Sequence, residues 1–199
     1  ITQGIGTRGV KAAIIKCATD TAGVTPVIEN ILRASARAQK ATGVPITTHC
    51  TRLGAETSQL TILDQEGVDL RRVIIGHTAA HLADPACRKV CLDWMKRGAN
   101  FMPTNLGIYP EDPTGKQWQG LIDALHIVFA AGHGDKIGFG LDSGYCSESC
   151  EFAPMTFLPP NPWTHMFTHT LPAFRAMGLT QDEEEAILQT NPQRILSVR

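Results

Sequence analysis

Short apolar runs alternate along the chain with longer segments in which apolar residues recur at helical spacing. The runs of strand length cover residues 10–18, 44–49, 73–75, 100–103 and 136–141. The helical segments cover residues 27–42, about 60–65, about 85–98, about 117–131, 163–177 and 180–189. Such alternation is typical of βα units built around a parallel sheet. We therefore predict an α/β fold with five βα units.

Helix-boundary residues support this division. Thr25-Pro26 supplies an N-cap and a first-turn proline, and Gly43 follows the end of the first helical segment. We expect the last helix to end before Pro192. The segment 143–162 contains four prolines and has the length of a functional or lid-like loop. Five units could build an open doubly wound sheet or belong to a (β/α)₈ barrel, and the count alone does not decide between them.

Four polar residues follow strand-length runs, where parallel α/β folds build their sites. Lys16 comes after residues 12–15, and Asp142 comes after residues 137–141. His49 and His77 stand at the ends of two runs between them. The carboxyl ends of parallel strands lie on one face, so these four side chains could converge. Taken singly, each histidine could be a hydrogen-bonded core residue, and Asp142 could be a turn residue.

Lys16 adds a second expectation. An ammonium at the end of an apolar strand is costly to bury unless it is paired, neutralised or modified. Two imidazoles and a carboxylate suit a borderline divalent metal such as zinc, and a lysine can join them only if its charge is removed, as carbamylation would do. We expect Lys16 to be buried for this reason.

Composition narrows the class of function. The 199 residues carry 18 Lys+Arg against 19 Asp+Glu, so the chain has no basic footprint for a nucleic-acid backbone. No apolar run approaches the length of a membrane span, and we expect a soluble, cytoplasmic protein.

The six cysteines form no C-x-x-C pair and predict mostly reduced, buried thiols. The spacing of Cys87 and Cys91 would place two thiols on one helix face, but it is a weak zinc signal because no second ligand pair lies beside it in the sequence.

The same residues lie within a longer pattern that resembles the phosphotriesterase family of the amidohydrolase superfamily, which are binuclear metal hydrolases on a (β/α)₈ barrel. The matching segments are residues 9–16, 42–49, 67–77, 134–142, 171–175 and 191–194. They occur in the same order over nearly the whole chain. This resemblance implies that the five units are strands four to eight of the barrel, and that residues 1–199 form a single partial barrel domain.

The resemblance also implies roles for the four residues. Lys16 would be carbamylated and bridge two divalent metals, His49 and His77 would bind the second metal, and Asp142 would bind the first. A hydroxide bridging the metals would be the nucleophile, since two cations lower the pKa of bound water and polarise a P=O or C=O bond. Asp142 would accept the proton.

The chain departs from the family at several positions. The family supplies a His-x-His from its first barrel strand, and this sequence contains none. We therefore expect the sequence to be a piece of a longer chain. Where relatives carry an Asp-Arg pair at the substrate pocket, equal spacing places Thr104 and Asn105 here, and Tyr145 and Trp163 are candidate pocket aromatics. We expect His81 to lie in a loop, near the site or facing solvent.

The resulting hypothesis is a zinc-dependent hydrolase that cleaves a phosphotriester, a lactone or another carboxylic ester. A related enzyme acting on amides is a variant of it. The alternative is an incomplete, non-catalytic metal-binding barrel module that pairs its open sheet edge with another chain. A small-molecule ester is the expected partner, no nucleic acid or membrane span is expected, and a homodimer is possible.

Overall fold

The computed structural model describes residues 1–106, 116–142 and 164–197, without the side chains of residues 116 and 117. In this part of the chain, four strands pair in parallel in the order β1-β2-β3-β4. The strands are β1 (Ile15–Thr19), β2 (Ile46–Cys50), β3 (Val73–Gly76) and β4 (Asn100–Met102). Sequential order and parallel pairing confirm the predicted succession of βα units around one sheet.

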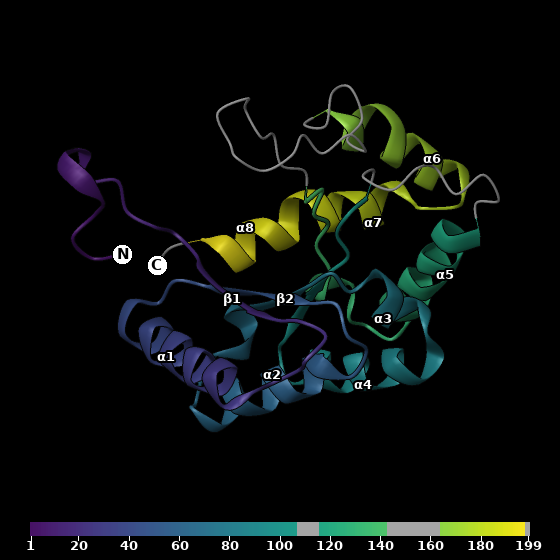
Figure 1. Ribbon diagram of the computed structural model, residues 1–199. Coiled ribbons are helices and arrows are strands. Elements are labelled where there is room, and N and C mark those ends of the chain that lie inside the picture. Colours follow the sequence, from purple (N-terminus) through teal and green to yellow (C-terminus); the bar gives the residue numbers. More distant parts are fainter. Residues whose placement is uncertain (107–115, 143–163, 198–199) are drawn as a thin grey trace, which may run out of the picture.

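Helices connect the strands. The helices are α1 (Pro26–Thr42), α2 (Ala55–Gln65), α3 (Ala79–Ala83), α4 (Pro85–Lys96), α5 (Lys116–Ala130), α6 (Leu171–Ala176), α7 (Gln181–Glu185) and α8 (Asn191–Leu196). Short 3-10 turns η1 (Gly6–Arg8), η2 (Leu70–Arg72) and η3 (Gly134–Lys136) and two π-helical turns η4 (Met166–Thr170) and η5 (Ala186–Thr190) complete the set. Helices α1, α2 and α4 lie together below the strands in Figure 1, with α7 and α8 on the other side.

The first helix forms as its boundary residues predict. The Thr25 hydroxyl accepts a hydrogen bond from the backbone N–H of Ile28, and Pro26 occupies the first turn. Gly43 ends the helix at φ 73°, a conformation that glycine adopts without a Cβ penalty. The buried side of α1, which includes Leu32 and Ala36, packs against the sheet.

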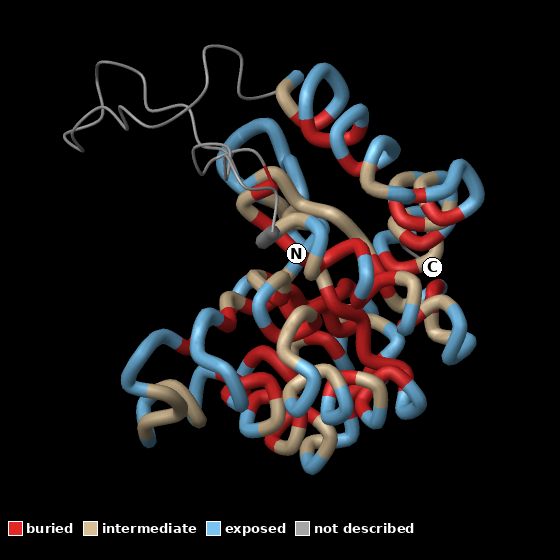
Figure 2. The backbone as a smooth tube through the Cα atoms, turned by 90° about the vertical axis from the view of Figure 1, so that its right-hand side faces the viewer, coloured by how far each residue is buried: buried red, intermediate tan, exposed pale blue. Residues whose placement is uncertain are grey.

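Side chains of the strands alternate between a covered and an open face. Cys17, Thr48, Ile75 and Phe101 are register partners across the four strands, and all are buried under the helices. The core is concentrated in this layer, as the red segments of Figure 2 show. On the other face, Lys16 and Ala18 of β1 are exposed. The candidate site residues Lys16 and His49 lie on this face.

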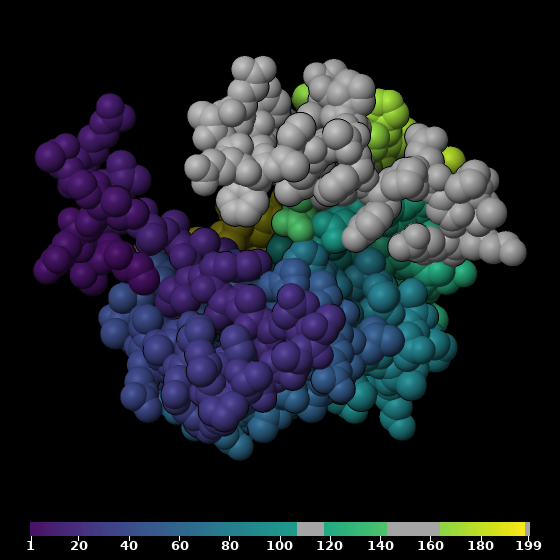
Figure 3. Space-filling model, in the orientation of Figure 1, coloured from purple at the N-terminus to yellow at the C-terminus, as the bar shows by residue number. Residues whose placement is uncertain are grey.

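The first strand is shorter than predicted. Residues 10–14 were expected to begin it, but β1 starts at Ile15, the register partner of Ile46 at the start of β2. Val10 instead forms an antiparallel bridge with Ile5 and is 63% exposed. In the part of the chain that the structure describes, no strand pairs with residues 11–14, and the first ten residues project from the body of the molecule (Figures 1 and 3).

The fifth predicted strand is present as an extended segment that pairs with β4 through one parallel bridge, Phe101 to Ile137. The backbone N–H of Gly138 donates to the carbonyl of Phe101 at 3.1 Å, and that of Gly140 donates to the carbonyl of Pro103 at 3.0 Å. The segment is therefore aligned with the sheet although its ladder is too short to form a regular strand.

Helix α8 holds this segment in place. The side-chain amide of Asn191, which is 2% exposed, donates to the carbonyl of Gly134 at 2.8 Å and to that of Ile137 at 2.7 Å. Three residues further along α8, Arg194 donates to the side chain of Asn100 at 2.9 Å. Asn100 in turn donates to the carbonyl of Val73 at 2.8 Å. These hydrogen bonds tie α8 to β3, β4 and the fifth segment.

The expectation that the last helix ends before Pro192 was wrong. The chain passes through the π-helical turn η5 and continues directly into α8, with Pro192 in its first turn. The same order occurs at η4 and α6, where Pro172 follows a π-helical turn. A proline lacks the N–H of the i→i−4 ladder and crowds the preceding turn, and a wider turn ahead of it relieves both problems. Helix α3 is a further element that the sequence pattern did not predict.

None of the described helices is both long enough and apolar enough to cross a membrane.

Replacing Asn191 by alanine should lower the free energy of unfolding by about 2 to 4 kcal/mol, because two buried carbonyl groups lose their donor. Chemical denaturation monitored by circular dichroism measures the change. Gln189→Ala, an exposed change in the adjoining turn, is the control and should stay within about 0.5 kcal/mol of the parent. Equal stability of the two variants would contradict this role for Asn191.

Candidate metal centre and active site

His49 and His77 are brought together at the carboxyl ends of two adjacent strands. His49 is the fourth residue of β2, and His77 directly follows β3. Their ring centroids lie 4.2 Å apart in an edge-to-face arrangement. Gly76 permits this approach, because a Cβ at that position would lie 2.5 Å from the carbonyl oxygen of Thr48. The predicted convergence of the two histidines is present in the structure.

Asp142 and Thr104 reach the same imidazole. One carboxylate oxygen of Asp142 lies 3.6 Å from Nδ1 of His77, and the Thr104 hydroxyl lies 2.7 Å from the same nitrogen. Thr104 is 7% exposed, whereas the side chain of Asp142 is 51% exposed. Thr104 thus fixes the orientation of the His77 ring. The sequence predicted Thr104 only as a substrate-pocket residue and did not predict this contact.

Lys16 lies on the same face as His49 but is exposed, so the expectation of a buried lysine was wrong. Its partner in the β1–β2 register is Thr47, and His49 is the partner of Ala18 two residues on. Lys16 is the second residue of β1 and does not end the strand. Its side chain is exposed because β1 is the edge strand of the described sheet and its open face is uncovered.

The surroundings of His77 favour its neutral form. Burial lowers its pKa below the ordinary value, and the nearby His49 and Lys16 lower it further, while the Asp142 carboxylate acts in the opposite direction. A neutral imidazole has a free lone pair, which is the form that binds a metal. The electrostatics are therefore compatible with His77 as a ligand.

Backbone strain is concentrated at this site. Among the described residues, the non-glycine residues with positive φ are His77 at 61°, Asn105 at 64° and Asp142 at 53°. Residues other than glycine rarely adopt this left-handed conformation, and such strain collects at functional sites. All three positions were selected from the sequence as candidate site residues.

The potential ligand atoms of the predicted site residues do not all lie close together. His49, His77 and Asp142 are not among the groups whose ligand atoms all lie within 4.8 Å of one another. Asn105 is half-buried next to Thr104. Tyr145, Trp163 and the segment 143–162 lie outside the described residues. The structure thus brings together His49, His77, Asp142 and Thr104, with Lys16 on the same face.

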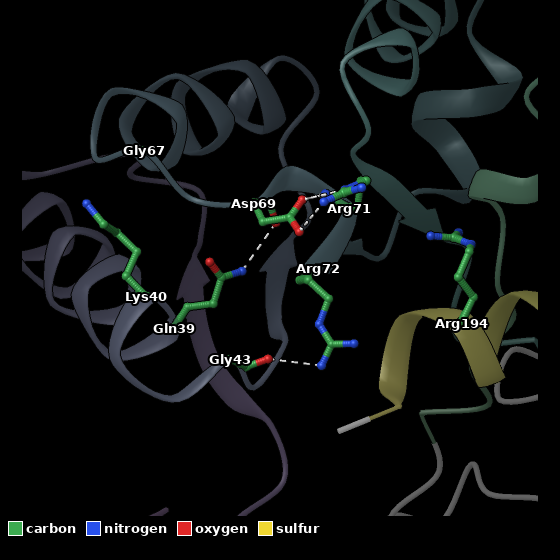
Figure 4. A pocket seen from close by; sticks show the side chains of 8 residues that line it. All are labelled: Gln39, Lys40, Gly43, Gly67, Asp69, Arg71, Arg72 and Arg194. Atoms are coloured by element: carbon green, nitrogen blue, oxygen red, sulfur yellow. Dashed lines mark hydrogen bonds and ion pairs between the residues drawn. The ribbon is translucent and has the colours of Figure 1, made fainter. Parts of the chain in front are cut away.

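A separate cleft opens at the opposite, amino ends of the strands. It is lined by Gln39, Lys40, Gly43, Gly67, Asp69, Arg71, Arg72 and Arg194 (Figure 4). Three of its four cationic side chains donate to backbone carbonyls: Lys40 to that of Glu66, Arg72 to that of Gly43, and Arg194 to that of Asp135. Arg71 pairs with the carboxylate of Asp69 at 2.9 Å. The cleft is distinct from the histidine pair, and no residue predicted for the site lies in it.

Comparison with known proteins identifies the family. The sequence matches the phosphotriesterase family over residues 1–196. The chain belongs to the phosphotriesterase family. It is 33% identical to the phosphotriesterase homology protein of Mycobacterium tuberculosis, over 98% of this chain and 58% of that protein. It is 29% identical to the aryldialkylphosphatase of Saccharolobus solfataricus, over 99% of this chain and 62% of that protein.

The solved structures agree. The structure of the phosphotriesterase from Mycobacterium tuberculosis superposes with a TM-score of 0.80 at 32% identity, covering all of this chain and 59% of that one. The chain therefore spans somewhat more than half the length of the relatives it matches. Its parallel α/β arrangement corresponds to part of the barrel of a family of metal-dependent hydrolases.

Replacing Thr104 by valine, which has nearly the same shape, should weaken metal binding by about 10- to 100-fold, because the His77 ring loses the hydrogen bond that orients it. Competition with a chromophoric chelator measures the affinity. Thr104→Ser keeps the hydroxyl and should bind metal as the parent does. The positioning role is wrong if the valine and serine variants bind metal equally well.

Proposed function

We propose that this protein is a metal-dependent hydrolase that cleaves a phosphotriester, a lactone or another carboxylic ester at a site formed by Lys16, His49, His77 and Asp142. The observation that carries the proposal is the convergence of His49 and His77 at the carboxyl ends of adjacent parallel strands, with Asp142 beside them, in a member of the phosphotriesterase family. In α/β folds this end of the sheet is where sites are built.

The residues present fit a divalent metal. Two partly buried imidazoles, of which that of His77 is favoured in its neutral form, and a carboxylate are a donor set suited to zinc. His49 and His77 would hold one cation and Asp142 the other, with a carbamate on Lys16 joining both. When bound, such cations lower the pKa of water and polarise the bond under attack.

The residues of the chain have distinct parts in the proposed reaction. Asp142 is half-exposed beside His77, so its carboxylate can receive a proton at the site and release it to solvent. The exposed Lys16 amine is accessible to dissolved CO₂, and carbamylation would convert it from a cation into an anionic ligand. Thr104 orients the ring of His77.

The names of the relatives and two substituted positions support a substrate class. The name aryldialkylphosphatase describes an enzyme acting on phosphotriesters, which favours this class for the present chain. Thr104 and Asn105 stand where the family carries an Asp-Arg pair, so this pocket has neither charge at those positions. A neutral pocket suits an uncharged ester or lactone, with Tyr145 and Trp163 as further candidate pocket residues.

A second candidate is a non-catalytic metal-binding module that pairs with another chain, including a second copy of itself. The position of β1 favours it, because β1 is an edge strand of the described sheet. Its side chains Lys16 and Ala18 are exposed, and Ile14 just before the strand is 40% exposed. An exposed parallel edge invites pairing with another strand. Metal stoichiometry and turnover separate this candidate from the hydrolase.

Lys16→Arg should reduce hydrolysis by about 100-fold or more and lower the metal content by at least one ion per chain, because arginine keeps the positive charge but cannot supply the bridging carbamate. Turnover of an aromatic phosphotriester, a lactone and an N-acyl amide, with metal analysis by mass spectrometry, tests this.

The matched control is Lys11→Arg, at an exposed position before β1, which should change neither quantity. If the parent chain turns over none of the three substrates and Lys16→Arg does not lower its metal content, the module replaces the hydrolase.

A further inference from the structure

A second group of potential metal ligands lies on the covered face of the sheet, behind the histidine pair. It consists of two triads that share Glu56 of α2: one adds Cys50 of β2 and His81 of α3, and the other adds Cys87 and Cys91 of α4. Cys50 adjoins His49 but points to the opposite face, as alternate residues of a strand do. His81 lies four residues after His77. The expectations that His81 lies in a loop or faces solvent were wrong, because it is fully buried in α3.

The group is buried and rich in soft donors. Cys50, Glu56, His81 and Cys91 each have 0% exposure, while Cys87 is partly exposed and gives the group a route to solvent. All three cysteines are free thiols. Thiolate, imidazole and carboxylate are the three ligand types that zinc sites combine.

The distances between donors match the edges of a tetrahedral site. Nε2 of His81 lies 3.3 Å from one carboxylate oxygen of Glu56 and 3.8 Å from Sγ of Cys50. Sγ of Cys87 lies 3.5 Å from the other carboxylate oxygen. Ordinary zinc bond lengths in tetrahedral geometry place such atoms about 3.4 to 3.8 Å apart. The donors of Cys50, Glu56 and His81 all lie within 4.8 Å of one another, and Cys87 approaches this triad through Glu56.

The hydrogen bonding of this group is incomplete without a cation. One Glu56 oxygen is buried and has no hydrogen-bond partner; Nδ1 of His81 is also unpartnered, but it would carry the ring proton if Nε2 bound a cation. Nε2 of His81 faces the Arg52 carbonyl at 3.1 Å in addition to Glu56 and Cys50, and a single hydrogen on this nitrogen can serve only one of them. Buried polar atoms are normally satisfied, so this many electron-rich atoms around one ring nitrogen calls for a positive charge among them.

We propose that Cys50, Glu56, His81 and Cys87 form a structural site for one zinc ion, with Cys91 packed beside it. Binding releases one proton from each of the two coordinating thiols as the sulfur–zinc bonds form. Without a cation, burial raises the pKa of Cys50 to about 12 and that of Cys87 to about 11, so both are thiols at neutral pH. This site is separate from the proposed active site and does not depend on it.

The proposed site would connect four elements behind the active face. It joins the end of β2, the first turn of α2, the short helix α3 and the start of α4. Cys50 directly follows His49, and α3 begins just after His77, so the ion would hold the backbone that presents both histidines.

The zinc content of a His49→Ala/His77→Ala variant tests the proposal, because this variant lacks the histidine pair on the open face. After loading and desalting, we expect one zinc per chain by mass spectrometry. Adding Cys50→Ser and Cys87→Ser should reduce this to near zero. Adding Cys17→Ser instead, a buried free thiol outside the group, should leave it unchanged.

Cobalt substitution of the unaltered protein provides a second measurement that needs no variant to fold. Sulfur-to-cobalt charge-transfer absorption in the near ultraviolet is expected, and the ligands proposed for the open face contain no sulfur. A double-histidine variant without bound zinc, together with no charge-transfer band, would leave a hydrogen-bonded His81–Glu56 pair and overturn the site. Loss of ester hydrolysis in the double-histidine variant bears only on the proposed function.

Discussion

The close parallel pairing of β2 with β3 is the constraint on which the rest of the structure depends. Gly76 allows it, because any larger residue would press a Cβ against the carbonyl of Thr48. The register that results places His49 and His77 side by side at the carboxyl ends. The left-handed backbone at His77 then turns the chain away into α3.

Alternation along the strands gives the two faces of this sheet different chemistry. The open face carries Lys16 and His49, and the covered face carries the buried partners of the helices, with Cys50 among them. The consecutive residues His49 and Cys50 therefore lie in different environments: His49 on the open face, and Cys50 in the space enclosed by α2, α3 and α4. The proposed zinc ion behind the sheet would stiffen the backbone from which the proposed active site is built.

The fifth segment depends on side chains as well as on backbone pairing. Besides its parallel bridge and two backbone hydrogen bonds beside β4, it is held by Asn191 of α8, while Arg194 links the same helix to Asn100. This network determines where the segment that ends at Asp142 lies. The motif at residues 191–194, noticed in the sequence as part of a family pattern, has a structural explanation here: it fastens the last helix to the sheet beside the site.

Local patterns in the sequence determined the order of the elements, the capped ends of α1 and the four polar positions of the candidate site, because periodicity and caps depend on neighbouring residues. Tertiary structure alone decided the exposure of Lys16, which follows from the position of β1 at an edge, and the contact between Thr104 and His77, which are 27 residues apart. It also decided the grouping of Cys87 with Glu56, Cys50 and His81. The spacing of Cys87 and Cys91 was a weak signal by itself, since Cys50 and Glu56 precede Cys87 by more than 30 residues and His81 lies in a different helix. Only the packing of α2, α3 and α4 against the sheet brings these donors together.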